Sequence, residues 1–228
     1  MSQIEFINVT KKYDGGFTAL DNVSMSIEDN EFVFLVGPSG AGKSTIVKML
    51  IREETCDSGQ IIFNGKNILE MAPDEIPDLR RKIGVVFQDF KLLNSKNVFQ
   101  NVAVALEVVD SKEAEIKSIV PSVLSLVGLT DKINCYPAQL SGGEKQRLCI
   151  ARALAHEPDV LIADEPTGNI DPDSSAQVIE ILEKINSMGT TIIMATHDER
   201  IVDKLKKRVI RLEKGVIVSD VKGGKYRG

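Results

Sequence analysis

Short apolar runs that end at glycine or polar residues recur along the chain. Phe32–Val36 is continuously apolar and is followed by glycine, which is typical of a strand buried on both faces. Three later runs, at 83–87, 160–163 and 191–195, have the same character, and a helical stretch precedes each of them. This alternation predicts an α/β fold built on a parallel sheet.

The N-terminal segment follows a different, alternating pattern. Apolar residues alternate with polar ones twice before the first buried run, at Ile4, Phe6 and Val9 and again at Val23, Met25 and Ile27. Turn residues stand at 15–16 and 29–30. The pattern predicts a small antiparallel β region ahead of the parallel sheet.

Helical periodicity replaces the strand signals between residues 89 and 155. We expect amphipathic helices there, with breaks near Pro121, Gly128 and Pro137. A further helix is expected to begin at Asp171-Pro172 and to end at Gly189. The sequence thus predicts one domain over residues 1–228, in which 1–88 and 156–228 form the α/β core with its β region and 89–155 forms a helical insert.

Composition and cysteine usage narrow the class of protein. The net charge is −5, which gives no indication of a nucleic-acid-coating surface. Three cysteines, Cys56, Cys135 and Cys149, lie far apart in no CxxC spacing, which disfavours disulfides and zinc and fits a reducing cytosol. No apolar run approaches the roughly 18 residues of a membrane span. We therefore expect any membrane role to come through a partner.

A glycine-rich segment after the first buried strand predicts phosphate binding. It fits G-x-x-x-x-G-K-[ST] and precedes an apolar helix. Glycines allow backbone N–H groups to surround a phosphate, and a helix N-terminus attracts the anion. An ordinary glycine-rich turn is the alternative. The candidate ATP contacts are Gly37, Pro38, Ser39, Gly40, Ala41, Gly42, Lys43, Ser44 and Thr45.

Within this loop, three side chains have separate expected roles. Lys43 would reach the β and γ phosphates, Thr45 the α-phosphate, and Ser44 would place its hydroxyl on Mg²⁺. Two carboxylates, Asp164 and Glu165, follow the buried run at 160–163, at the strand end where open α/β sheets bind ligands. We expect Asp164 to hold Mg²⁺ through water and Glu165 to act as general base, although two solvated charges would give the same pattern.

The segment Ser141-Gly142-Gly143-Glu144 predicts a helix start. Ser141 and Glu144 have the spacing of a capping box. Gly142 and Gly143 each cost helix stability, about 1 kcal/mol, yet they expose backbone N–H groups to an anion. The pair therefore suggests a second phosphate contact.

Residues 140–147, LSGGEKQR, resemble the signature sequence of the ATP-binding-cassette (ABC) ATPases. The resemblance covers the chain from Ile4 to about Leu212. It implies a P-loop NTPase (RecA-like) core, an N-terminal antiparallel β subdomain and a helical subdomain that carries the signature. It also implies a head-to-tail homodimer, in which the signature of one copy, Ser141 to Gly143, closes over the ATP held by the other.

The same resemblance implies roles for four further residues. Gln88 matches the Q-loop glutamine that contacts Mg²⁺ or water, and His197 matches the histidine that binds the γ-phosphate. Asp171 lies in the D-loop that crosses the dimer interface, and Tyr13 matches the aromatic that stacks on adenine. Without the family, these residues would be interpreted as a surface glutamine, a structural histidine, a helix N-cap and a core aromatic.

Within the ABC family, the chain resembles the bacterial cell-division branch. The matching segments are 75–77, 79–81, 83–84, 87–90, 92–93 and 101–103. Residues 165–169 are shared with lipoprotein-export and macrolide-export ATPases, which are the alternatives, and Lys145 and Ile170 depart mildly from the common residues. The resemblance implies an integral membrane partner of the FtsX type, seated near Gln88 and the helical subdomain.

Such a partner implies a location and a task. The ATPase would lie at the cytoplasmic face of the bacterial inner membrane and would activate cell-wall hydrolases rather than carry a solute. A soluble ABC protein acting on ribosomes or DNA is a further alternative, disfavoured by the single cassette without a heptad run. Glu165 disfavours a regulator that binds ATP without hydrolysing it.

Overall fold

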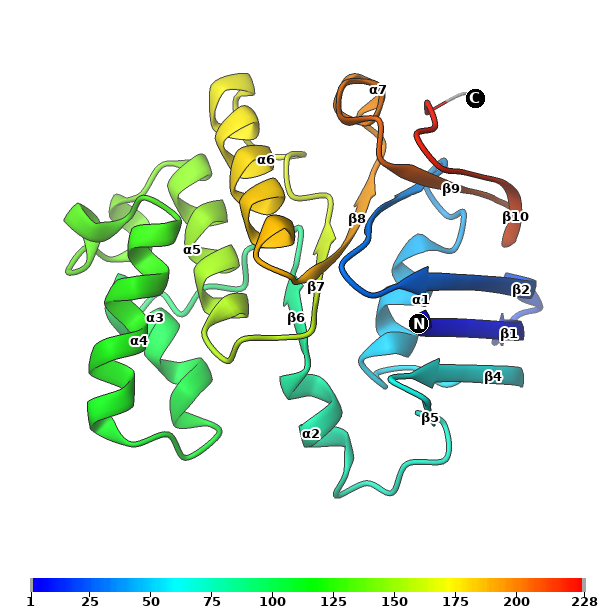
Figure 1. Ribbon diagram of the computed structural model, residues 1–228, viewed down its shortest axis with the longest axis horizontal. Helices are drawn as coiled ribbons and strands as arrows, with labels where there is room; N and C mark the ends of the chain where they lie inside the picture. The colour runs from blue at the N-terminus through cyan, green and yellow to red at the C-terminus, as the bar shows by residue number, and fades with distance from the viewer. Residues whose placement is uncertain (1, 227–228) are drawn as a thin grey trace. The chain divides into compact units, whose positions relative to one another are not determined.

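The computed structural model describes residues 2–226. The chain divides into two compact units, one formed by Met1–Arg80 with Gly189–Gly228 and the other by Arg81–Met188. Most of their helices and strands are labelled in Figure 1. One helix, α2 (Ile76–Arg81), spans the boundary between them.

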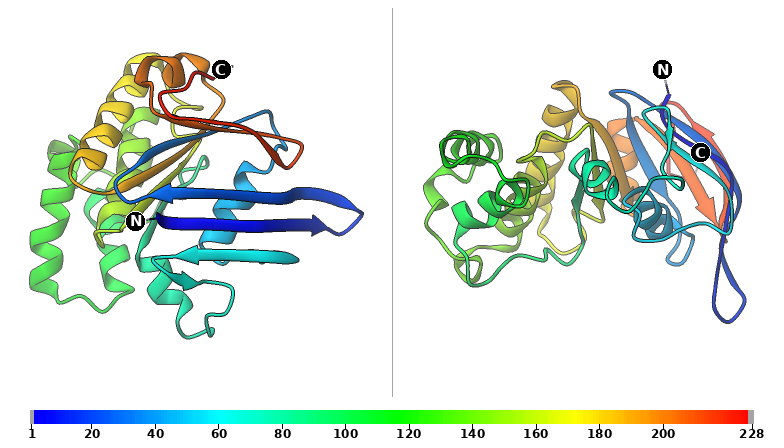
Figure 2. Two further views of the ribbon diagram at one scale, coloured as in Figure 1. Left: turned by 45° about the vertical axis from the view of Figure 1, so that its right-hand side comes forward. Right: turned by 90° about the horizontal axis from the view of Figure 1, so that it is seen from below.

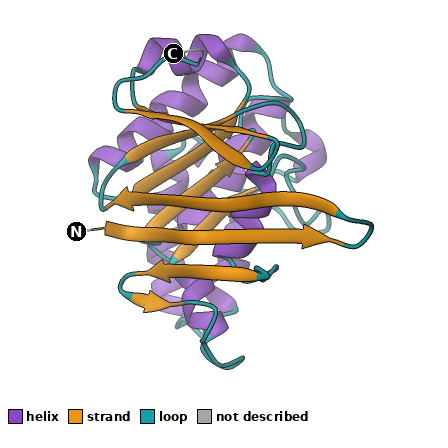
Figure 3. Ribbon diagram, turned by 90° about the vertical axis from the view of Figure 1, so that its right-hand side faces the viewer, coloured by secondary structure: helices purple, strands orange, loops and turns teal. Residues whose placement is uncertain are grey.

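The first unit contains the predicted antiparallel β region. Four strands lie in the order β2-β1-β4-β5: β1 (Ser2–Tyr13), β2 (Phe17–Glu28), β4 (Ser58–Phe63) and β5 (Lys66–Asn67) (Figure 3). The expected turn at 15–16 is confirmed, because β1 and β2 pair as a hairpin around residues 14–16. The tip of this hairpin extends past the end of β4 (Figure 2). β4 and β5 were not predicted.

The same unit holds the first buried strand of the parallel sheet. All five residues of β3 (Phe32–Val36) are buried, and β3 pairs in parallel with β8 (Thr191–Thr196) and with β9 (Arg208–Glu213). β10 (Val216–Val221) extends β9 as an antiparallel edge strand. Helices α1 (Lys43–Leu50) and α7 (Glu199–Leu205) complete the unit.

The second unit joins two buried strands to the helical stretch. β6 (Ile83–Val86) pairs in parallel with β7 (Val160–Asp164). Between them run α3 (Val98–Glu107), α4 (Glu113–Leu126) and α5 (Gly142–Leu154), and α6 (Pro172–Ser187) follows β7. α5 packs on α3, α4 and α6 (Figure 1). The absence of strands from 89 to 155 is confirmed for this described segment.

Two of the three expected helix breaks are confirmed and one is wrong. α4 ends at Leu126 and Gly128 follows with a φ of 67°, while Pro137 opens a 3₁₀ turn over Pro137–Gln139. Pro121, however, lies inside α4 on its exposed side. A proline removes one helical hydrogen bond. Here the burial of Val120 and Leu124, which flank Pro121 in the same helix, stabilises the helix despite the missing bond.

None of the helices in the described part of the chain is long and apolar enough to cross a membrane. The three cysteines are free thiols.

The proline inside α4 leads to a stability prediction. Pro121→Ala restores a backbone donor and relieves the clash with the preceding turn, so the free energy of unfolding should rise by about 1–3 kcal/mol. Urea denaturation of the whole chain measures this. Ser122→Ala, a change at the exposed neighbour, should leave the free energy nearly unchanged. A proline variant no more stable than the parent would contradict the assignment of a strained helix interior.

Candidate functional site

The loop between β3 and α1 is built from bare backbone. Gly37 and Gly42 have φ angles of 145° and 108°, which favour glycine. A Cβ atom on Gly37 would lie 2.1 Å from the carbonyl oxygen of Leu212, and one on Gly42 would lie 2.6 Å from that of Ala19. Gly40 also has a positive φ, 77°, but faces open space. Packing therefore requires glycine at both ends of the loop.

The start of α1 has the character of an anion site. Gly42 is the N-cap and supplies no side-chain bond, and the first turn holds no acidic residue. The first N–H groups of a helix have no partner within it and carry partial positive charge. The ammonium of Lys43 donates to the carbonyls of Gly37 at 2.7 Å and of Pro38 at 3.0 Å. A buried cation above bare backbone fits the phosphates of a nucleotide.

Neighbouring side chains in the first unit fit the rest of the expected site. Ser44 is exposed at the start of α1, where a hydroxyl can meet a magnesium ion held by phosphate oxygens. The β3–β8 register pairs Val36 with Thr196, so Gly37 and His197 leave the sheet side by side at the same edge. The structure thus brings His197 to the phosphate loop.

Tyr13 lies at the end of β1, beside the hairpin tip. It is half-buried, pairs across the strands with Phe17, and has the Lys11 ammonium 5.1 Å from its ring centre. The exposed part of its ring leaves room for a stacked base. Its contact with adenine stays a prediction.

The second unit gathers Gln88, Asp164 and Glu165. The β6–β7 register pairs Val86 with Ala163, so Gln88 and Glu165 each lie two residues beyond the paired positions at the carboxyl edge. Asp164 and Glu165 are half-buried and Gln88 is exposed. Glu165 has a φ of 50°, a strained conformation for a glutamate, and its carbonyl accepts from the N–H of Gly168 at 3.1 Å. Strain of this kind is concentrated at functional sites.

The predicted capping box at the start of α5 is confirmed. The Ser141 hydroxyl accepts from the N–H of Glu144 at 3.2 Å, and the Glu144 carboxylate accepts from the N–H of Ser141 at 2.8 Å. These bonds to Ser141 hold the pKa of Glu144 below its usual value. The hydroxyl of Ser141 is thereby fixed at the helix start beside Gly142 and Gly143.

Gly143 has a second role that the sequence interpretation missed. A Cβ on Gly143 would lie 2.2 Å from the Ser174 hydroxyl oxygen and 2.5 Å from the Ser174 Cβ. Ser174 stands in the first turn of α6, where its N–H donates to the Asp171 carboxylate at 2.9 Å, so Asp171 is the N-cap as expected. The bare backbone at Gly143 therefore lets the signature segment pack directly on the segment that follows the D-loop.

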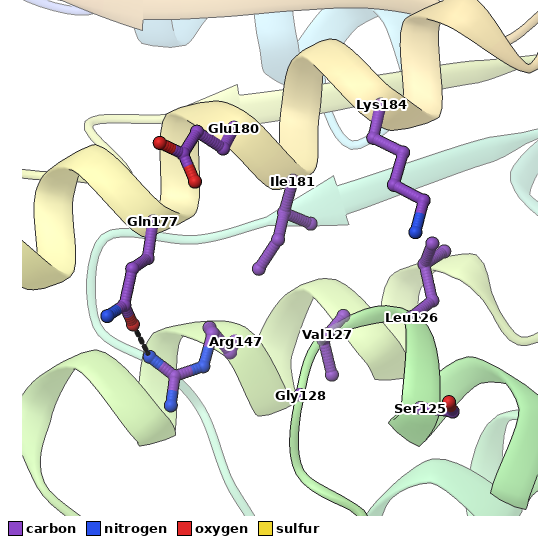
Figure 4. A pocket seen from close by; sticks show the side chains of 9 residues that line it. All are labelled: Ser125, Leu126, Val127, Gly128, Arg147, Gln177, Glu180, Ile181 and Lys184. Carbon is purple, nitrogen blue, oxygen red and sulfur yellow. Dashed lines mark hydrogen bonds between the residues drawn. The ribbon is translucent and has the colours of Figure 1, made fainter.

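A separate hollow of about 340 Å³ lies among α4, α5 and α6 (Figure 4). One guanidinium N–H of Arg147 donates to the Gln177 side-chain oxygen at 2.6 Å beside it, and Ile181 points into it. Its lining contains none of the predicted site residues. The hollow is distinct from the candidate site.

Residues 20–168 match the family model described as ABC transporter, and the chain belongs to this family of ATP-binding cassettes. It is an ATPase of that type, which uses Mg²⁺. Among its relatives, the cell division ATP-binding protein FtsE of Bacillus subtilis is 54% identical over 98% of both chains. FtsE of Mycobacterium tuberculosis is 48% identical over 96% of both.

Two solved structures confirm the expected fold. CbiO1 from Clostridium perfringens, part of the ABC transporter complex cbiONQ, is 32% identical with a TM-score of 0.90, over 97% of this chain and 89% of that one. A dimeric ATP-binding cassette in a post-hydrolysis state, bound to ADP and Pi, is 33% identical with a TM-score of 0.86 over 99% of both chains. The P-loop NTPase core with its antiparallel β and helical parts is thereby confirmed.

The close approach at Gly143 leads to a test by paired substitutions. Gly143→Ala should lower the free energy of unfolding by about 1–3 kcal/mol, because the added methyl overlaps Ser174. Ser174→Gly removes both overlapping atoms and should recover part of that loss. Ser174→Ala keeps the overlapping Cβ and is the matched control, which should recover little. Urea denaturation of the single and double variants measures the coupling, and purely additive effects would contradict the contact.

Proposed function

We propose that the loop of residues 37–45 binds the phosphates of ATP and that Glu165 drives the hydrolysis. The conformation of this loop supports the proposal. Its glycines expose backbone N–H groups, and the Lys43 ammonium donates hydrogen bonds to two carbonyls of the loop. When ATP arrives, the ammonium exchanges these neutral acceptors for phosphate oxygens, a stronger charge-assisted bond. Tyr13 stacks on the adenine ring, and His197 bonds the γ-phosphate.

In the second unit, the half-buried Glu165 accepts a proton from the attacking water as general base. Ser44, Gln88 and Asp164 are the residues that would hold Mg²⁺. A bound Mg²⁺ would neutralise charge on the phosphates. Main-chain N–H groups of Gly142 and Gly143 with the Ser141 hydroxyl bind the nucleotide of a second copy, and Asp171 lies at that interface. Residues 89–155 form the helical subdomain.

Two substitutions separate binding from chemistry. Glu165→Gln removes the proton acceptor and should lower kcat at least about 100-fold while ATP affinity stays nearly unchanged. Lys43→Ala removes a charged donor and should weaken ATP binding itself, by about 1.5–3 kcal/mol. Steady-state ATPase assays and equilibrium titration with a fluorescent ATP analogue measure the two effects. Undiminished turnover in Glu165→Gln would rule out this residue as the base.

We further propose that the chain serves cell division as the ATPase of a membrane-bound complex. The names of its relatives and their full-length identity support this task. The partner is an integral membrane protein of the FtsX type, which holds the ATPase at the cytoplasmic face of the bacterial inner membrane. Closure of the ATP-bound homodimer then moves the partner, which activates peptidoglycan hydrolases outside. Nucleic acid has no part in this task.

The partner decides between division and the alternatives. Glu165→Gln loaded with Mg·ATP should capture an FtsX-type protein from detergent-solubilised membranes, identified by mass spectrometry. Lys43→Ala is the matched control and should capture much less, because it cannot hold the ATP that closes the dimer. Recovery of a lipoprotein-export or macrolide-export permease would replace the division role. Recovery of ribosomal or DNA-bound proteins alone would favour a soluble ABC protein.

A further inference from the structure

The loop of residues 87–97, which joins β6 to α3 and begins with Phe87 and Gln88, is shaped by side chains from elsewhere in its unit. The backbone–backbone hydrogen bonds found inside it join Lys91 to Asp89 and Lys96 to Leu93, and both stay within the loop. Such local bonds do not hold a loop in place on the protein.

Two consecutive residues of this loop have left-handed backbone. Phe90 has a φ of 37° and Lys91 a φ of 48°. This region disfavours residues with a side chain, and two in succession are rarer still. Left alone, the loop would relax to other conformations, so contacts from outside must favour this one.

The C-terminal half of α5 supplies those contacts. The Arg152 guanidinium donates through Nη2 to the Phe90 carbonyl at 3.0 Å and through Nη1 to the Lys91 carbonyl at 2.7 Å. The Cys149 thiol donates to the same Phe90 carbonyl at 3.1 Å. Burial raises the pKa of Cys149 to about 12, so the thiol keeps the proton that this bond needs. We call Arg152 and Cys149, with the two carbonyls they bind, the α5 clamp.

The far end of the loop is fixed independently by α3. The fully buried Asn101 side chain accepts from the Leu93 N–H at 2.9 Å and donates to three carbonyls, those of Leu93, Lys96 and Asn97. The α5 clamp therefore holds the beginning of the loop, next to Gln88.

We propose that Arg152 is a positioning residue for ATP hydrolysis, because its fork of N–H groups holds Phe90 and Lys91 and thereby places Gln88. This inference rests on the proposed function in taking Gln88 as a site residue. Arg152 also lies on the helix that begins with the signature glycines, about 15 Å along it from Gly142 at 1.5 Å per residue. The clamp thus joins the Gln88 loop to the signature segment through one helix.

Kinetics of the whole chain test the clamp. Arg152→Gln should lower kcat about ten- to hundredfold by misplacing Gln88, while KM for ATP and the urea midpoint stay close to the parent's. Arg152→Lys keeps the charge but not the paired donors, so it should recover only part of the rate. Undiminished kcat in Arg152→Gln overturns the proposal. A drop in the urea midpoint that accounts for the lost activity overturns it as well, because the residue would then be merely structural.

A second substitution separates the clamp from other roles of the arginine. Glycine at position 91 adopts the left-handed conformation without steric cost, so the loop needs Arg152 less in the Lys91→Gly variant. Adding Arg152→Gln to Lys91→Gly should therefore lower log kcat by less than half of the decrease that Arg152→Gln causes in the parent chain. Asp110→Gly is the matched control, since Asp110 also has left-handed backbone, with a φ of 56°, but lies outside the loop. An equal loss in the Lys91→Gly and Asp110→Gly backgrounds would contradict the clamp.

Hydrogen exchange keeps this test apart from that of the proposed function. Amides 89–93 should exchange faster in Arg152→Gln, with the α5 amides unchanged, whether or not ATP is turned over. Unchanged exchange there overturns the clamp alone. Failure of the parent chain to hydrolyse Mg·ATP would instead overturn the proposed function, and the exchange result would still decide whether Arg152 holds the loop.

Discussion

Direct packing of glycine backbone on a neighbouring carbonyl is the constraint on which the phosphate loop depends. Gly37 lies against Leu212 and Gly42 against Ala19, with no room for a side chain between them. This packing fixes both ends of the loop on strands of the first unit, so the N–H groups between them are already arranged before any ligand binds. Preorganised donors lose little free energy to reordering when an anion arrives.

Close packing on a glycine backbone also occurs in the second unit, at the signature segment. Gly143 permits the start of α5 to touch Ser174, and the capping box holds Ser141 in place beside it. The signature and the D-loop helix are thereby joined within one chain. A motion of α6 is therefore expected to move Ser141, Gly142 and Gly143, the residues proposed to bind the nucleotide of a second copy.

Strained backbone occurs in the second unit after the strands β6 and β7. Glu165, Phe90 and Lys91 all adopt left-handed conformations without being glycine. For Phe90 and Lys91 the compensating bonds come from Arg152 and Cys149, and for Glu165 one comes from Gly168. A conformation held by a few specific bonds can switch when one of them is exchanged, which suits residues that respond to a ligand or partner.

Local chemistry made much of this protein predictable from sequence. The patterns that predict the β3 strand, the glycine-rich loop and the capping box each lie within a few consecutive positions, and the structure contains a strand at Phe32–Val36, a glycine loop leading into α1 and a capping box at Ser141. The strands β4, β5, β9 and β10 were missed because their apolar runs are short. In addition, β4 and β9 pair with strands distant in sequence, β1 and β3. The roles of Tyr13, Gln88, His197 and Asp171 came only from family resemblance.

Contacts between distant residues were decided by tertiary structure alone. Pro121 was expected to break a helix, but burial of Val120 and Leu124 outweighs one missing hydrogen bond. The need for glycine at position 143 comes from Ser174, and the shape of the Gln88 loop comes from Arg152, some 60 residues further along. A sequence displays which groups can bond, whereas which of them meet depends on how the helices pack, and that is a property of the whole fold.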